Sequence, residues 1–228
     1  MTSFFERIIK RSTEIQSLLC VGLDPHGEQH SVSEIASFNR ELIEATKSFA
    51  VAYKPNFAFY ESYGIPGLIA LEETLKAIPK NIPVIADAKR GDIGSTAEAY
   101  AKALFDEWAF DAVTVNPYMG KDSVEPFLQY SDRGIFILCR TSNPGAQQFQ
   151  SLTLNDGQFL YEYLAKMVIT WGSNVGLVIG ATAPEELQRI HRLVPNTPLL
   201  VPGIGAQGGS INDVIQAAYN GWGKMLIN

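Results

Sequence analysis

Eight short apolar runs recur along the chain, and each gap between them leaves room for one helix. The runs have the length of strands and lie at residues 17–23, 49–54, 83–88, 112–116, 134–139, 175–180, 198–203 and 224–228. The segments between them show helical spacing of apolar residues, at roughly 32–47, 66–78, 95–108, 123–130, 157–171, 184–193 and 210–220. Apolar strands that alternate with helices predict a parallel sheet covered by helices. We therefore expect an α/β fold, and the number of units favours a (β/α)8 TIM barrel.

Two of these helices carry start signals in the sequence. Ser95 and Glu98 have the spacing of a capping box, and Pro184 stands in a first turn, where its missing N–H does no harm. The alternative fold is a doubly wound sheet, which would place a glycine-rich phosphate loop after the first strand. Residues 22–27, GLDPHG, do not match that fingerprint. Because no stretch resembles a linker, we expect one barrel domain over residues 1–228.

Composition excludes several classes of partner. The formal net charge is −6 and the pI is about 5.1, whereas nucleic acids and anionic membranes require basic surfaces. No apolar run reaches the length of a membrane span, and the first residues do not resemble a signal peptide. Cys20 and Cys139 lie in apolar runs and are predicted to be reduced core thiols. We therefore expect a cytoplasmic protein that binds neither nucleic acid nor membrane.

Charged side chains collect at the ends of the first three strands. Because alternate residues of a strand face the same way, the inward sets are Cys20, Gly22 and Asp24, then Ala50, Ala52, Lys54 and Asn56, then Ile85, Asp87 and Lys89. The opposite set of Leu19, Val21 and Leu23 is expected to lie under the helices. Barrels of this class carry their active sites at the carboxyl ends of the strands.

We therefore expect Asp24, Lys54, Asp87 and Lys89 to share one mouth as an array of alternating acids and bases. Opposite neighbours keep such groups ionised, although burial acts against this. The array would repel one negative charge and stabilise another that forms nearby. By the same alternation, Arg90 is expected to be exposed in a structural ion pair. The spacing of His26, His30 and His191 does not fit metal ligands, so we expect no metal site.

Residues 87–96, DAKRGDIGST, closely resemble a motif of the orotidine 5'-phosphate decarboxylases, in particular those of the bacterial branch with longer loops. Further similar segments are VGLDP (21–25), YKPN (53–56), TVNPYMG (114–120), RTSNPGA (140–146) and VPGIGAQGG (201–209). The resemblance implies cofactor-independent decarboxylation of orotidine 5'-monophosphate to UMP in pyrimidine biosynthesis. It also implies a homodimer with shared active sites.

The resemblance assigns a role to each matching residue. Asp87 would lie against the scissile carboxylate, and Lys89 would protonate C6 of the pyrimidine after carbon dioxide leaves. Lys54 would tie this network to the ribose, and Asp24 would bind a ribose hydroxyl. The remaining assignments are substrate contacts at Ser142, Pro202 and Gln207, with Asp92, Ile93 and Thr96 donated across the dimer interface. Without the resemblance, the 141–146 and 201–209 segments would fit structural turns equally well.

Two alternatives stay open from the residues alone. Asp87, Lys89 and Asp92 also fit the spacing of related Mg²⁺-dependent sugar-phosphate lyases, although Arg90 and the 140–146 segment argue against this. The other alternative is a truncated barrel that binds nucleotides without catalysis. In the family, a phosphate-binding arginine and a closing helix follow the eighth strand, and this sequence stops at Asn228 before either. We therefore expect that the loop and the final helix belong to a longer chain.

Overall fold

The computed structural model describes residues 2–25, 31–205 and 207–228. Its strands in these ranges are β1 (Cys20–Leu23), β2 (Ala52–Pro55), β3 (Ile85–Arg90), β4 (Ala112–Val115), β5 (Gly134–Arg140), β6 (Val175–Ile179), β7 (Leu199–Val201) and β8 (Met225–Ile227). β1 pairs with β2, and β3 to β8 pair in chain order, all parallel. Bridges between Tyr53 and Val84 and between Leu19 and Ile227 join the two sheets. The prediction of a (β/α)8 barrel is confirmed.

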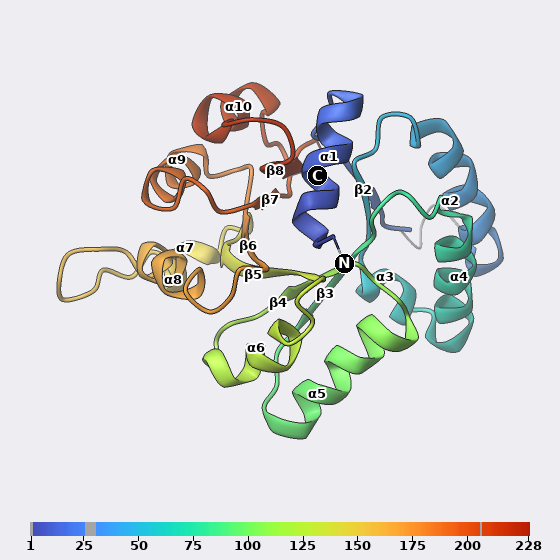
Figure 1. Cartoon of the computed structure of the whole chain (residues 1–228), viewed down its shortest axis with the longest axis horizontal. Coiled ribbons are helices and arrows are strands. Elements are labelled where there is room, and N and C mark those ends of the chain that lie inside the picture. Colours follow the sequence, from blue (N-terminus) through green and yellow to red (C-terminus); the bar gives the residue numbers. More distant parts are fainter. Residues whose placement is uncertain (1, 26–30, 206) are drawn as a thin grey trace.

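Helices surround the strands on all sides (Figure 1). The ring consists of α2 (Val32–Thr46), α4 (Gly64–Ala77), α5 (Gly94–Lys102) with its π-helical continuation η1 (Ala103–Glu107), α6 (Lys121–Leu128), α8 (Leu160–Val168), α9 (Pro184–Leu193) and α10 (Ile211–Ala218). These elements match the predicted helical segments. The sequence pattern did not predict α1 (Phe4–Ile15), α3 (Phe57–Glu61) or α7 (Ala146–Gln150).

The helix α1 closes the amino-terminal end of the barrel and lies across the strands in Figure 1. Ser3 and Glu6 form a capping box at its start. Its buried side chains, including Phe4, pack among inward residues from the strands, and the Phe4 ring meets Phe136 edge to face at 5.9 Å. A side chain at Gly134 would overlap the Phe4 ring, so glycine permits this close approach.

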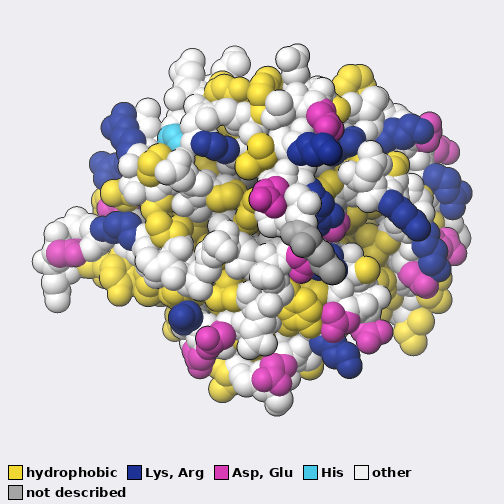
Figure 2. All heavy atoms as spheres, viewed as in Figure 1, with side chains coloured by type: hydrophobic (Ala, Val, Ile, Leu, Met, Phe, Trp, Pro, Cys, Tyr) yellow, Lys and Arg dark blue, Asp and Glu magenta, His cyan; other side chains and the backbone are white. Residues whose placement is uncertain are grey.

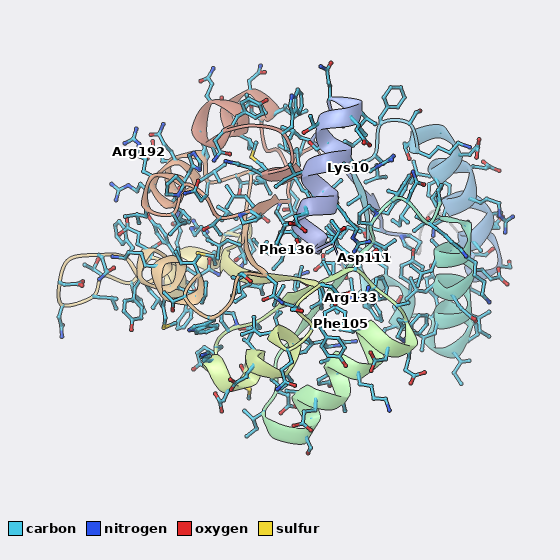
Figure 3. All side chains as sticks on the ribbon, viewed as in Figure 1. Lys10, Phe105, Asp111, Arg133, Phe136 and Arg192 are labelled. Atoms are coloured by element: carbon cyan, nitrogen blue, oxygen red, sulfur yellow. The ribbon has the colours of Figure 1, made fainter. Side chains whose placement is uncertain are left out.

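An ion-pair cluster holds α1 against the strands. The Arg7 guanidinium lies 2.7 Å from Asp111 Oδ1, and Arg133 lies 3.6 Å from the same oxygen. Asp111 Oδ2 accepts a hydrogen bond from the Val84 backbone N–H at 2.8 Å. Figure 3 labels Asp111, Arg133 and Phe136 at this end of the barrel.

Three local predictions can be compared with the structure. Pro184 is in the first turn of α9, as expected. The predicted capping box at Ser95 is wrong, because Ile93 is the N-cap residue and Ser95 already lies inside the first turn. Leu19 is 39% exposed, so its predicted place under the helices is also wrong. It precedes β1, whereas Val21 and Leu23 pack in a buried cluster beside the barrel.

The two cysteines lie in the interior, as the sequence predicts. Cys20 and Cys139 are buried free thiols, and burial raises the pKa of each to about 12. On the face shown in Figure 2, basic and acidic side chains are interspersed. In the part of the chain that the structure describes, no helix has both the length and the apolar character to cross a membrane.

We predict that Phe4→Ala lowers the free energy of unfolding by about 3–5 kcal/mol, because it empties a buried site among the strands. Denaturant unfolding monitored by circular dichroism measures the change. Phe49→Ala is the matched control, because Phe49 is 63% exposed and its loss is expected to cost less than about 0.5 kcal/mol. Equal changes in both variants would contradict a structural role for α1.

Candidate active site

A cavity of about 710 Å³ opens at the carboxyl ends of the strands. Asp24, Lys54, Asp87 and Lys89 all line it, as the alternation of the first three strands predicted. Side chains from the later strands line it too, including Thr114, Leu138, Val178 and Leu200. The cavity therefore joins a charged wall from β1 to β3 with a largely apolar wall from β5 to β7.

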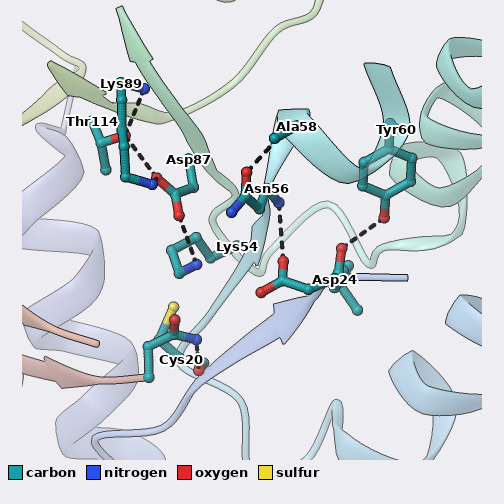
Figure 4. Close-up of polar contacts among 11 residues, drawn as sticks. Cys20, Asp24, Lys54, Asn56, Ala58, Tyr60, Asp87, Lys89 and Thr114 are labelled. Atoms are coloured by element: carbon teal, nitrogen blue, oxygen red, sulfur yellow. Dashed lines mark hydrogen bonds and ion pairs between the residues drawn. The ribbon is translucent and has the colours of Figure 1, made fainter. Parts of the chain in front are cut away.

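The carboxylate of Asp87 is the centre of the charged wall (Figure 4). Lys89 Nζ donates to Asp87 Oδ1 at 2.6 Å, and Lys54 Nζ donates to Oδ2 at 3.2 Å. The Thr114 hydroxyl donates to Oδ1 at 3.0 Å. Lys54 is 3% exposed and Asp87 9%, whereas the Lys89 side chain is 50% exposed. The array thus has a buried ion pair and one ammonium that remains accessible.

Mutual attraction keeps the buried pair ionised. Burial acts to raise the pKa of Asp87, but the Lys54 and Lys89 ammonium groups outweigh it and hold this pKa below its ordinary value. Burial acts to lower the pKa of Lys54, but Asp87 and then Asp24 outweigh it, so this pKa is raised. Both groups therefore stay charged at neutral pH.

The end of β1 places Asp24 beside this pair. Asp24 Oδ1 accepts a hydrogen bond from the Asn56 backbone N–H at 3.1 Å. The buried Tyr60 hydroxyl donates to the Leu23 carbonyl at 2.8 Å, which fixes the backbone just before Asp24. Figure 4 shows Asp24 and Asn56 on adjacent strand ends, with Tyr60 to their right. The acids and bases of β1, β2 and β3 thus form one electrostatic unit.

The backbone around Lys89 departs from a regular strand. The pairing of β3 with β4 shifts between Ala86 and Arg90, and Lys89 has a left-handed φ of 46°. Arg90 is half-buried rather than exposed as predicted, because its guanidinium lies over the Phe57 and Tyr100 rings. Its predicted ion pair is present, with Glu61 at 2.9 Å.

Two loops form the opposite rim. The Ser142 hydroxyl, after β5, donates to Gln207 Oε1, after β7, at 2.5 Å. Pro202 and Gly203 also line the cavity, and Gly203 has a left-handed φ of 104° that favours glycine. Ser142, Pro202 and Gln207 thus come together as predicted, while Ala206 of the same loop lies outside the described residues.

Three predicted site residues do not line this cavity in a single chain. Ile93 is 55% exposed, and Asp92 Oδ1 accepts a hydrogen bond from the Ile93 N–H of its own loop at 2.8 Å. Thr96 is exposed in the first turn of α5. Their place on the surface is compatible with donation to a neighbouring chain, which stays a prediction.

Sequence reasoning missed several residues of the cavity. Thr114 is the polar residue of the apolar run AVTV, and alternation along β4 would have placed it inward. Asn56 was assigned to the inward face but not to the site, and Asn228 also lines the cavity. The Asn228 side chain donates to the Cys20 carbonyl at 2.8 Å, a contact across 208 positions that no local pattern indicates.

The one histidine among the described residues, His191, does not line this cavity. His191 lies on α9, and burial lowers its pKa. His26 and His30 lie outside the described residues. Among the residues that are described, no group of three or more His, Cys, Asp or Glu side chains is arranged to hold a metal ion.

Comparison with known protein families shows which family this chain belongs to. The model of the orotidine 5'-phosphate decarboxylase / HUMPS family matches residues 17–221. The chain belongs to this family. A curated orotidine 5'-phosphate decarboxylase from Herpetosiphon aurantiacus is 50% identical over 224 residues, which cover 94% of this chain and 84% of that protein. One from Dehalococcoides mccartyi is 49% identical over 230 residues, which cover 98% of this chain and 85% of that protein.

Solved structures of the family share the whole fold. The OMP decarboxylase of Leishmania donovani superposes with a TM-score of 0.91 at 43% identity, covering 100% of this chain and 89% of its own. The UMP synthase of the same organism gives a TM-score of 0.94 at 45% identity, and this chain spans 51% of it. The resemblance inferred from the 87–96 motif is confirmed.

We predict that Asp87→Asn lowers the free energy of unfolding by about 3 kcal/mol at neutral pH, because two ammonium groups lose their shared counter-charge. The folded-state pKa of Asp87 is depressed, so its stabilising contribution is present above the unfolded-state pKa and is lost as pH falls through the folded-state pKa. The difference from wild type should therefore shrink below about pH 4. Urea unfolding at several pH values measures it, and a difference that grows on acidification would contradict the depressed pKa.

Proposed function

We propose that this single-domain barrel decarboxylates orotidine 5'-monophosphate to UMP in the cytoplasm, as a homodimer and without metal or cofactor. The observation that carries the proposal is the Lys54–Asp87–Lys89 array in the cavity of a chain that belongs to the decarboxylase family. The names of its relatives at about 50% identity support the same substrate and reaction.

The chemistry requires a fixed positive charge beside one carbon. Loss of carbon dioxide leaves the electron pair of the broken C–C bond on C6, where no ring carbonyl is placed to delocalise it. The accessible Lys89 ammonium stabilises this carbanion and then transfers one proton to C6. Solvent returns a proton to Lys89, whose side chain is half exposed.

Asp87 has a different task, because its charge has the same sign as the substrate carboxylate. The Lys54 and Lys89 ammonium groups keep it ionised, so it repels the carboxylate that must leave. Repulsion in the ground state is relieved as neutral carbon dioxide forms, so it favours the transition state over bound substrate. The same carboxylate holds the Lys89 ammonium in place for the proton transfer.

The rest of the cavity binds and surrounds the substrate. In this proposal Asp24 and Lys54 contact the ribose, and the pair of Ser142 and Gln207 contacts the pyrimidine edge. The glycine-rich loop after β7, with Pro202 at its start, offers backbone amides to the phosphate. The apolar side chains of Leu138, Val178 and Leu200 lower the local dielectric constant, which strengthens the attraction between Lys89 and the carbanion.

A Mg²⁺-dependent lyase reaction is disfavoured by charge. Both carboxylate oxygens of Asp87 already accept hydrogen bonds from ammonium groups, and these groups would repel a divalent cation. Turnover of orotidine 5'-monophosphate in the presence of EDTA would contradict both the metal-dependent lyase and the hypothesis of a non-catalytic nucleotide-binding barrel. Loss of activity on chelation would favour the metal-dependent reaction.

We predict that Lys89→Ala lowers kcat for orotidine 5'-monophosphate by at least about 10²–10⁴-fold, because it removes the proton donor. The decrease in ultraviolet absorbance of the substrate, with EDTA present, measures turnover. Calorimetric titration with UMP is the control for binding, which should be largely retained. Near-normal turnover in this variant would refute Lys89 as the proton donor.

We also predict that Asp92→Ala is inactive but is rescued by inactive Lys89→Ala subunits. A hybrid dimer would contain one site with both Lys89 and a donated Asp92. Random exchange of subunits at equal amounts should restore about a quarter of wild-type activity, since half of the dimers are hybrids with one intact site. Activity is followed after mixing, with each variant alone as the control. No recovery, despite subunit exchange seen by mass spectrometry, would count against a shared site.

A further inference from the structure

The strand β3 contains extra residues at the point where the catalytic side chains begin. Ala86 pairs with Val113 and Arg90 pairs with Val115, so four steps along β3 face two steps along β4. Residues in such a bulge lose their ladder partners on the neighbouring strand, and their N–H groups need other acceptors. Lys89 lies in this bulge with a left-handed backbone. This conformation is rare for residues other than glycine and persists only where the surrounding structure holds it.

The side chain of Thr114 supplies the missing acceptor. Its Oγ1 accepts a hydrogen bond from the Lys89 backbone N–H at 3.0 Å and donates one to Asp87 Oδ1 at 3.0 Å. The Thr114 hydroxyl has one proton. Because its oxygen accepts the hydrogen bond from the Lys89 N–H, this proton is free to point toward the Asp87 carboxylate. Thr114 is 1% exposed, and Figure 4 shows it beside the backbone of Lys89 and the carboxylate of Asp87.

We propose that Thr114 is a positioning residue for decarboxylation, because its hydroxyl fixes the left-handed backbone of Lys89 relative to the Asp87 carboxylate. The inference rests on the proposed function, in which the Lys89 ammonium protonates the substrate. A hydrophobic residue of the same shape at position 114 would leave the Lys89 N–H without this acceptor and Asp87 without this donor. The bulge would then relax, and the ammonium would lose its fixed place at the cavity.

The effect of the hydroxyl is separable from that of packing. Thr114→Val keeps the shape of the side chain and removes both hydrogen bonds, whereas Thr114→Ser keeps the hydroxyl. We expect kcat of Thr114→Val to fall roughly 10- to 100-fold, because small displacements of a catalytic group are costly, while KM changes less than about threefold. Thr114→Ser should recover most of the lost kcat. Thr114→Ala gives a second hydroxyl-free variant if the valine protein does not fold.

Thr46, at the end of helix α2 and outside the ring of strands, provides the matched control. The Thr46 hydroxyl donates to the Leu42 carbonyl at 2.7 Å and lies 2.9 Å from the Tyr53 hydroxyl, on the outer side of β2. Thr46→Val therefore removes a comparable network without touching the cavity. It should lower the melting temperature while leaving kcat and KM unchanged.

Hydrogen exchange of the Lys89 backbone amide, measured by NMR without substrate, adds a readout that does not depend on turnover. We expect Thr114→Val to lose protection at this amide by at least about tenfold, and Thr114→Ser to keep it. The proposal is overturned if wild type is active and Thr114→Val keeps its kcat within about twofold, even with reduced stability. If wild type does not decarboxylate the substrate, the proposed function fails, and unchanged protection in Thr114→Val would separately show that Thr114 does not hold Lys89.

Discussion

The site depends on one carboxylate that is buried between two ammonium groups. Asp87 is 9% exposed, and without Lys54 and Lys89 its burial would raise its pKa and favour the neutral acid. The barrel makes this arrangement possible because parallel strands bring Lys54 from β2 and Asp87 from β3 to adjacent inward positions. The charged wall is therefore a property of the fold, and its buried acid Asp87 and buried base Lys54 keep each other ionised.

The two ends of the barrel serve different purposes. At the amino-terminal end, α1 fills the interior with Phe4 and Phe5, and Arg7 anchors the helix to Asp111. At the carboxyl end the interior stays open and polar on one side. The tightly packed amino-terminal end stabilises the barrel. The carboxyl end can therefore hold charged side chains in fixed positions without contributing most of the packing that keeps the strands together.

Two local patterns were sufficient to predict the barrel and the four charged residues. One is the alternation of side chains along each strand, and the other is the helical spacing of apolar residues between the strands. They could not predict the bulge at Lys89, which arises from the pairing of β3 with β4, nor the half-burial of Arg90 over two aromatic rings. They also missed α1, whose amphipathic pattern gave no indication of what it packs against. Asn228 enters the site through barrel closure, and the donation of Asp92, Ile93 and Thr96 to a neighbouring chain stays a prediction.

Closure of the barrel joins residues that are 208 positions apart in the chain. The bridge between Leu19 and Ile227 and the hydrogen bond from Asn228 to Cys20 both cross the junction of β1 and β8. Contacts of such long sequence separation carry the largest loss of chain entropy and form slowly. Because Gly22, Asp24 and Asn228 line the cavity on both sides of that junction, a partly folded barrel has no complete site. Recovery of activity during refolding would therefore report the longest-range step of folding.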